Sequence, residues 1–176
     1  MIRSIIVIAA AGLAFASSAS AAVIGKLPYG FEVRYEAIVA LPPAKAWSRL
    51  IAIGTWWSDE HTFGGKAANM TIDPKAGGCF CEVLPESNGG VEHLRVTYVV
   101  PNQRLVMGGA LGPLKFEGVA GVMDIRLNPA SEGKTQVIFV YRAGGFARGN
   151  GEDMAPLVDR VIGEQVARFA APPATP

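Results

Sequence analysis

Apolar residues near the C-terminus recur with the period of an α-helix. Between Glu152 and Ala171 they form one continuous stripe, which only Gln165 interrupts. The members of this stripe are Met154, Leu157, Val158, Val161, Ile162, Val166 and Phe169. Pro172 and Pro173, which lack a backbone N–H, end the pattern. The pattern predicts one long amphipathic helix that buries its stripe against the rest of the chain.

Most of the chain before this helix has the patterns of β-strands. After a short lead (residues 23–30), the segment from Phe31 to Ala40 alternates apolar and polar residues. Two short helices are predicted next, at residues 43–51 and 55–58. Six further strands follow with short turns between them, at residues 70–73, 79–84, 91–100, 104–110, 118–128 and 135–143. We therefore predict an α+β fold in which a curved antiparallel sheet of about seven strands wraps around the C-terminal helix.

The first 22 residues have the features of a secretory signal peptide. Arg3 precedes an apolar run from Ile5 to Phe15, and Ala19-Ser20-Ala21 matches a cleavage site. The run has 11 residues, too few for a membrane anchor, which needs about 20. We expect a secreted or periplasmic protein that is cleaved near Ala21 and has no membrane span afterwards. The expected remainder is a single domain (23–171) and a disordered tail (172–176).

The composition excludes several classes of protein. The net charge is +1 and half of the residues are hydrophobic, which argues against a nucleic-acid-binding surface and against intrinsic disorder. The sequence contains no phosphate-binding loop and no metalloprotease motif. We therefore expect no metal, cofactor or nucleic acid, and make no prediction of the oligomeric state.

Several short motifs resemble one protein superfamily. They are Leu41-Pro42-Pro43-Ala44 before a helix with Trp47, the pair Trp56-Trp57, and Gly77 to Glu82 after Asp73-Pro74. Together with the closing helix, they make the chain similar to the SRPBCC superfamily (START/Bet v 1-like, helix-grip fold). Within it, the chain most resembles the branch related to the C-terminal domain of the Hsp90 ATPase activator. The resemblance covers residues 31–169.

The resemblance implies a ligand pocket rather than a particular reaction. Members of the superfamily bind hydrophobic or amphipathic small molecules under the long helix, and some are cyclases or hydrolases. We therefore expect an exported binding protein, with an enzyme that uses the same cavity as the alternative. A co-chaperone-like interaction module is a second alternative, although export argues against it because Hsp90 is cytosolic.

Two ionisable residues are candidates for acid–base chemistry. Glu82 shares a strand face with Phe80, and a carboxylate that points into a cavity can act as an acid or base. The alternative, which the sequence favours, is a surface charge paired with Arg95 or Lys75. His93 alternates with apolar neighbours, which favours a solvent-exposed position on its strand.

The residues expected to contact a ligand are mainly aromatic. One ring of the Trp56-Trp57 pair is expected in the core, which leaves the other free for a ligand. The full predicted set is Trp56, Trp57, Phe80, Tyr98, Tyr141, Val158 and Ile162.

Cys79 and Cys81 lie two residues apart on a predicted strand. In an extended strand their Cα atoms would be about 6.5–7 Å apart, at the upper limit for a disulfide. This spacing predicts two buried thiols. The alternatives are an oxidised pair, as an exporting compartment would favour, and a metal or redox site.

Overall fold

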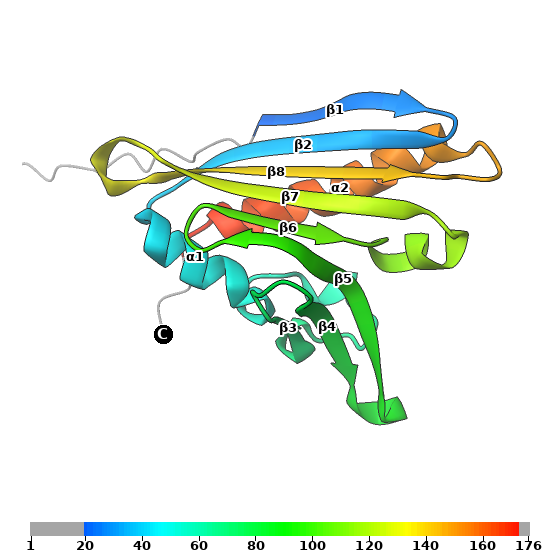
Figure 1. The fold of residues 1–176 in the computed structure, drawn as a ribbon, viewed down its shortest axis with the longest axis horizontal. Coiled ribbons are helices and arrows are strands. Elements are labelled where there is room, and N and C mark those ends of the chain that lie inside the picture. Colours follow the sequence, from blue (N-terminus) through cyan, green and yellow to red (C-terminus); the bar gives the residue numbers. More distant parts are fainter. Residues whose placement is uncertain (1–19, 173–176) are drawn as a thin grey trace, which may run out of the picture.

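The computed structural model describes residues 20–172, which form an eight-stranded sheet with two α-helices (Figure 1). The predicted α+β fold, with its curved antiparallel sheet and C-terminal helix, is confirmed. Apart from residues 20–22, the predicted signal peptide lies outside the described residues. The same holds for the predicted tail beyond Pro172.

Every strand runs antiparallel to its neighbours, in the order β1-β2-β8-β7-β6-β5-β4-β3. The strands are β1 (Ser20–Leu27), β2 (Gly30–Val39), β3 (Met70–Ile72), β4 (Cys79–Leu84), β5 (Gly89–Val100), β6 (Arg104–Gly108), β7 (Ala120–Pro129) and β8 (Thr135–Gly144). The prediction of about seven strands omitted β1, which occupies most of the expected lead. A tight turn at Pro28 and Tyr29 allows β1 to pair with β2. Residues 20–27 are a strand because of this pairing, although their sequence lacks an alternating pattern.

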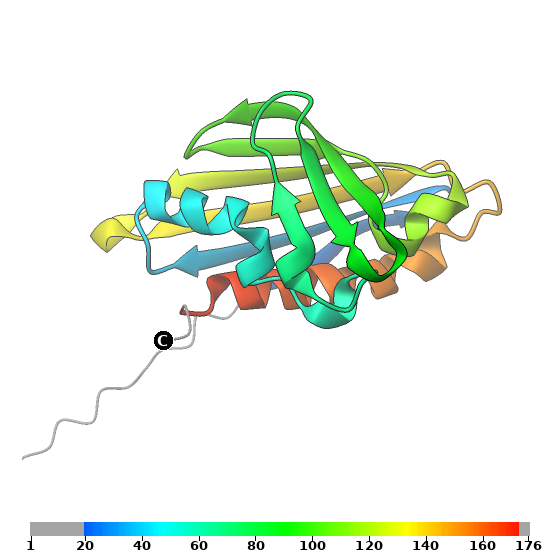
Figure 2. The same cartoon turned by 90° about the horizontal axis from the view of Figure 1, so that it is seen from below.

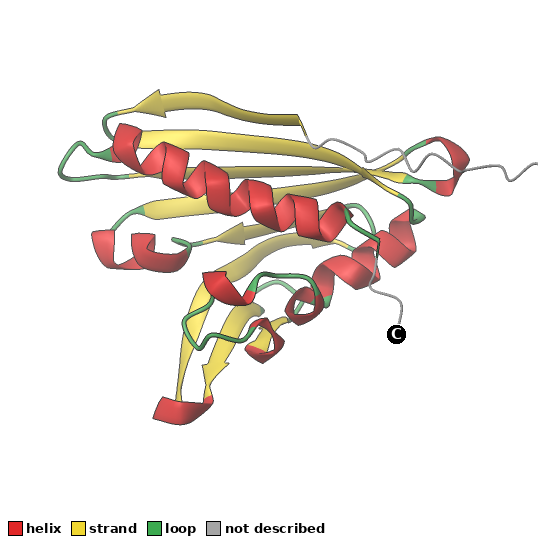
Figure 3. Cartoon of the chain, turned by 180° about the vertical axis from the view of Figure 1, so that it is seen from behind, coloured by secondary structure: helices red, strands yellow, loops and turns green. Residues whose placement is uncertain are grey.

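The long helix α2 (Gly151–Ala170) crosses one face of the sheet, as Figures 2 and 3 show from two sides. It packs mainly against β2 and β1. The alternation in β2 directs Val33, Tyr35 and Ala37 toward the core, where they are buried. The hydrophobic core therefore lies between this face of the sheet and the helices.

Helix α1 (Pro43–Ile51) follows β2 at the end of the sheet. Its Trp47 and Leu50 are buried, and Arg49 donates hydrogen bonds to carbonyl oxygens at the C-terminus of α2. The helix predicted at residues 55–58 does not form: this segment is a turn between two 3₁₀ turns, Ile53–Thr55 and Asp59–His61. A third 3₁₀ turn follows at Ala67–Asn69. Within residues 20–172, no helix has the length and hydrophobicity needed to cross a membrane.

Candidate functional site

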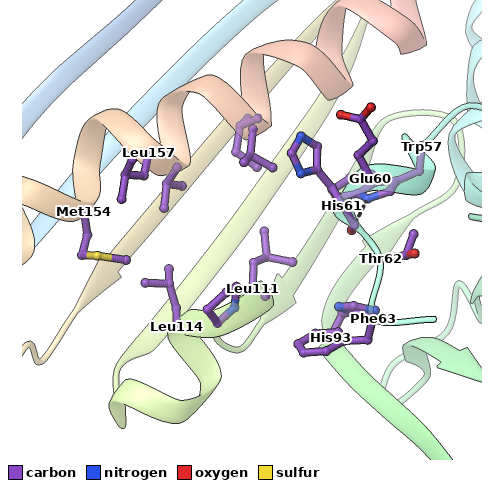
Figure 4. Close-up of a pocket in the computed structure, with 15 residues that line it drawn as sticks. Trp57, Glu60, His61, Thr62, Phe63, His93, Leu111, Leu114, Met154 and Leu157 are labelled. Atoms are coloured by element: carbon purple, nitrogen blue, oxygen red, sulfur yellow. Dashed lines mark hydrogen bonds between the residues drawn. The ribbon is translucent and has the colours of Figure 1, made fainter. Parts of the chain in front are cut away.

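A cavity of about 370 Å³ lies between the N-terminal half of α2, the loop after α1 and the 3₁₀ segment Gly112–Glu117 (Figure 4). This volume is in the usual range of small-molecule sites, about 300–1,000 Å³. The residues that line it are Trp57, Glu60, His61, Thr62, Phe63, His93, Leu111, Gly112, Pro113, Leu114, Met154, Leu157, Val158, Val161 and Ile162. Several of them are exposed, among them Pro113 and Leu157, so the cavity opens to solvent.

The apolar stripe of α2 explains where the cavity forms. In the C-terminal half of the helix, Val166 and Phe169 are fully buried against the core. In the N-terminal half, Leu157 of the same stripe is 49% exposed, and Met154 and Val158 are only partly buried. One end of the stripe is therefore covered by the core, whereas the other end faces the cavity.

Hydrogen bonds fasten the loop that forms the opposite wall to α2. The Ser58 N–H donates to Oε1 of Gln165 over 2.8 Å, which accounts for the polar residue in the stripe. Nε2 of His61 lies 2.9 Å from Oε2 of Glu164. These contacts hold the loop against α2, so this wall of the cavity is fixed by hydrogen bonds within the protein.

Glu82 and His93 form a buried pair beside the cavity. Nε2 of His93 lies 3.0 Å from Oε2 of Glu82, and the two residues are 3% and 1% exposed. Glu82 also accepts the backbone N–H of Phe63 at 3.0 Å and of Gly64 at 2.6 Å. Glu82 thus anchors the loop that carries Phe63 and orients His93, which lines the cavity.

The surface positions that we favoured for these two residues are wrong. Arg95 forms its ion pair with Glu92, and Lys75 forms one with Asp73, so neither pairs with Glu82.

A β-bulge explains the burial of His93. Phe80 pairs with Leu94 and Cys81 pairs with Glu92, so His93 has no partner on β4. A bulge changes the direction of the side chains around it. Here it leaves both His93 and Leu94 buried, which simple alternation along the strand does not allow.

The surroundings of His93 favour its neutral form. Burial lowers the pKa of His93, and the positive charge of Lys115 lowers it further, while Glu82 opposes the shift. The ring of Phe80 stacks on the imidazole with centroids 4.9 Å apart. A neutral imidazole has one nitrogen that accepts a hydrogen bond or a proton.

Both tryptophans of the Trp56-Trp57 pair are buried, Trp56 in the core and Trp57 at the wall of the cavity. Trp56 packs edge-on against Phe169 at 5.1 Å, and its Nε1 donates to the Arg49 carbonyl oxygen. Trp57 is 8% exposed and lines the cavity, and its Nε1 donates to the His61 carbonyl oxygen.

The structure separates the other predicted contact residues into two groups. Val158 and Ile162 line the cavity, and Phe80 lines a small neighbouring cavity of about 20 Å³ together with Trp56. Tyr98 and Tyr141 line neither.

Tyr98 is 50% exposed, because a second bulge between Val96 and Tyr98 reverses the direction of its side chain. The centroid of its ring lies 5.5 Å from the guanidinium carbon of Arg104. Tyr141 is fully buried, and its hydroxyl accepts the Leu111 N–H at 3.0 Å. Burial raises the pKa of Tyr141 to about 12. Neither tyrosine is therefore placed to contact a ligand in the cavity.

A disulfide joins Cys79 and Cys81, which corrects the prediction of two thiols. Their Cα atoms are 5.3 Å apart, well within the range for a disulfide, about 4.4–6.8 Å. The strand is contracted at Phe80, next to the register shift with β5, so the distance expected for a fully extended strand does not apply.

Sequence reasoning missed the walls that loops contribute. Phe63, Leu111 and Leu114 line the cavity from segments without periodic patterns, so no local signal identifies them. Met154 and Leu157 belong to the predicted helical stripe and were identifiable from it. Within the described residues, no group of three or more His, Cys, Asp and Glu side chains is placed to hold a metal ion.

No family model and no curated protein matches this sequence. Solved structures of similar fold include the Mll3558 protein from Rhizobium loti, with a TM-score of 0.58 and 18% identity over 80% of this chain and 95% of that one. EF2215 from Enterococcus faecalis, a conserved protein of unknown function, has a TM-score of 0.56 and 11% identity over 90% of this chain and 82% of that one. At these identities the likeness concerns the fold alone.

Proposed function

We propose that this chain is an exported protein that binds a hydrophobic or amphipathic small molecule in the cavity beside α2. The proposal includes membership of the helix-grip (SRPBCC) superfamily, supported by the sequence motifs and by the sheet and C-terminal helix. The observation that carries the proposal is the 370 Å³ cavity with a mostly apolar lining. A helix packed flush against the sheet would have left no such space.

Burial of apolar surface supplies the driving force for this binding. Each square ångström of apolar surface removed from water contributes about 25 cal/mol. Met154, Leu157 and Val158 on α2 and Leu111 on the opposite side present such surface to the cavity. An apolar ligand would cover these residues and complete the burial of the stripe.

A fluorescent probe tests the binding. The neutral dye N-phenyl-1-naphthylamine should bind with increased emission, and Val158→Phe, which fills the cavity, should weaken binding at least about tenfold (about 1.4 kcal/mol). Val83→Phe is the matched control, because Val83 is 58% exposed on β4 and does not line the cavity. Equal affinities of the two variants would contradict the proposed site. Mass spectrometry of small molecules extracted from the native protein would then identify the ligand.

The export part of the proposal depends on the sequence of residues 1–22. N-terminal sequencing of protein from the cell envelope or the medium tests it, and Ala22 is the expected first residue. A mature protein that retains Met1 and stays in the cytoplasm would contradict export while leaving the cavity proposal intact.

The Glu82–His93 contact favours an enzyme as the second candidate. A carboxylate that orients an imidazole at the wall of a substrate cavity is an arrangement suited to general acid–base catalysis. Such an enzyme would act as a cyclase or hydrolase on the bound molecule. Incubation of the extracted ligand with fresh protein tests this: a product formed by the wild type and lost in His93→Gln supports catalysis. A ligand recovered unchanged supports binding alone.

A further inference from the structure

The polar residues of the cavity gather on one side of it. Figure 4 shows Glu60, His61, Thr62 and His93 there, together with Trp57 and Phe63, and Leu114, Met154 and Leu157 toward the other side. The other polar side chains that line the cavity either contact a partner in the protein or are exposed to solvent. His61 contacts Glu164, the Thr62 hydroxyl donates to the Asp59 carbonyl oxygen, and Glu60 is exposed. Among the lining residues, His93 is the one buried polar side chain.

The contacts of Glu82 determine which nitrogen of His93 carries the proton. The backbone N–H groups of Phe63 and Gly64 donate one hydrogen bond to each carboxylate oxygen of Glu82. A carboxylate only accepts, so Nε2 of His93 donates its hydrogen to Glu82 across 3.0 Å. A neutral His93 then has its lone pair on Nδ1, for which no described residue provides a donor.

A molecule that fills the cavity displaces solvent from this acceptor, and it loses affinity unless it supplies a hydrogen-bond donor in exchange. Because His93 lines the cavity, Nδ1 is the polar ring atom that a bound molecule can reach. A hydroxyl group meets this requirement. A carboxylate carries no hydrogen of its own, so it could bind Nδ1 only if His93 took up a proton, which burial and the positive charge of Lys115 oppose.

We propose that the cavity selects an uncharged amphipathic alcohol or phenol, whose hydroxyl donates to Nδ1 of His93 and whose hydrocarbon body lies along Met154, Leu157 and Val158. This inference rests on the proposed function and names the ligand class of the same site. Glu82 acts as a positioning residue, because it fixes the tautomer of His93 without touching the ligand.

A matched series of three compounds tests the proposal at pH 7.5. The compounds are 4-hexylphenol, its methyl ether 4-hexylanisole and the anion of 4-hexylbenzoic acid, each measured by displacement of N-phenyl-1-naphthylamine. The phenol should bind about tenfold more tightly than the ether, and also more tightly than the anion. His93→Phe should remove the preference for the phenol over the ether.

The possible failures are distinguishable. Binding of the phenol and the ether within about twofold of each other, or a preference that survives in His93→Phe, would overturn the ligand class but not the binding function. Absence of binding by the dye and by all three compounds would overturn both. If His93→Phe does not fold, ¹⁵N NMR of the wild-type imidazole replaces it. The Nδ1 resonance should then shift with the phenol but not with the ether, and equal responses would contradict the proposal.

Discussion

The hydroxyl of Tyr35 on β2 lies 2.7 Å from Oδ1 of Asp159 and 2.8 Å from its carbonyl oxygen, and so joins the middle of this strand to α2. Tyr35 is 5% exposed, and burial together with the hydrogen bond to Asp159 raises the pKa of its phenol above the usual value. The group therefore stays a protonated donor throughout the neutral range. This contact fixes the helix whose N-terminal half forms a wall of the cavity.

Tyr35→Phe should lower the free energy of unfolding by about 1–3 kcal/mol, because it leaves acceptors of Asp159 without their donor. Urea denaturation measures the change. Tyr29→Phe is the control: Tyr29 is 67% exposed, so a change within about 0.5 kcal/mol is expected. A Tyr35→Phe protein as stable as the control would show that the contact contributes nothing.

Gly163→Ala should also destabilise the protein, although alanine favours a helix over glycine by about 1 kcal/mol. An added Cβ at Gly163 would lie 2.6 Å from the Tyr35 hydroxyl oxygen and 2.8 Å from Cζ of the same ring. Overpacking of this kind costs about 1–3 kcal/mol, which exceeds the gain in propensity. The exposed Ala167→Gly on the same helix measures the propensity effect alone. A more stable Gly163→Ala variant would indicate that α2 shifts freely over Tyr35.

The disulfide between Cys79 and Cys81 predicts no reactive thiol in the oxidised protein. Alkylation in denaturant should modify neither cysteine before reduction and both after it, with intact mass as the readout. The double variant Cys79→Ser, Cys81→Ser should have a free energy of unfolding that is lower by about 1.5 kcal/mol. The decrease is small because closing a three-residue loop restricts the unfolded chain only slightly. Alkylation of both cysteines without reductant would contradict the disulfide and support the two thiols that the sequence predicts.

Stability should fall as the pH drops below about 6.5, the usual pKa of histidine. The lowered pKa of His93 means that the folded state binds fewer protons than the unfolded state between that pKa and 6.5. The free energy of unfolding therefore rises with pH in this window, by at most about 1.4 kcal/mol per unit for one group. The charged groups that act on His93 are Glu82, which opposes the shift, and Lys115, which adds to it.

Urea titrations of the wild type and His93→Phe from pH 7.5 to 5 isolate this contribution. The wild type should lose more stability than the variant as the pH falls. Parallel profiles would mean that His93 titrates with the same pKa in the folded and unfolded states.

Local patterns in the sequence determined most of the secondary structure. The segment predicted at residues 79–84 coincides with β4, and the helix predicted to begin at Glu152 begins at Gly151. Both follow from periods of 2.0 and 3.6 residues, which depend only on near neighbours in the chain. The same stripe on α2 identified Val158 and Ile162, which line the cavity.

The tertiary structure decided which residues meet at the site. Alternation assigned His93 to the solvent, and Tyr98 was predicted to contact the ligand. His93 is instead buried and Tyr98 is exposed, because bulges in β5 change the side-chain directions. A bulge forms when two strands pair with unequal numbers of residues, so it depends on the partner strand and not on the local sequence. The position of Glu82 beside Phe63, Gly64 and His93 likewise arises from segments distant in the chain, which only the folded sheet and its loops bring together.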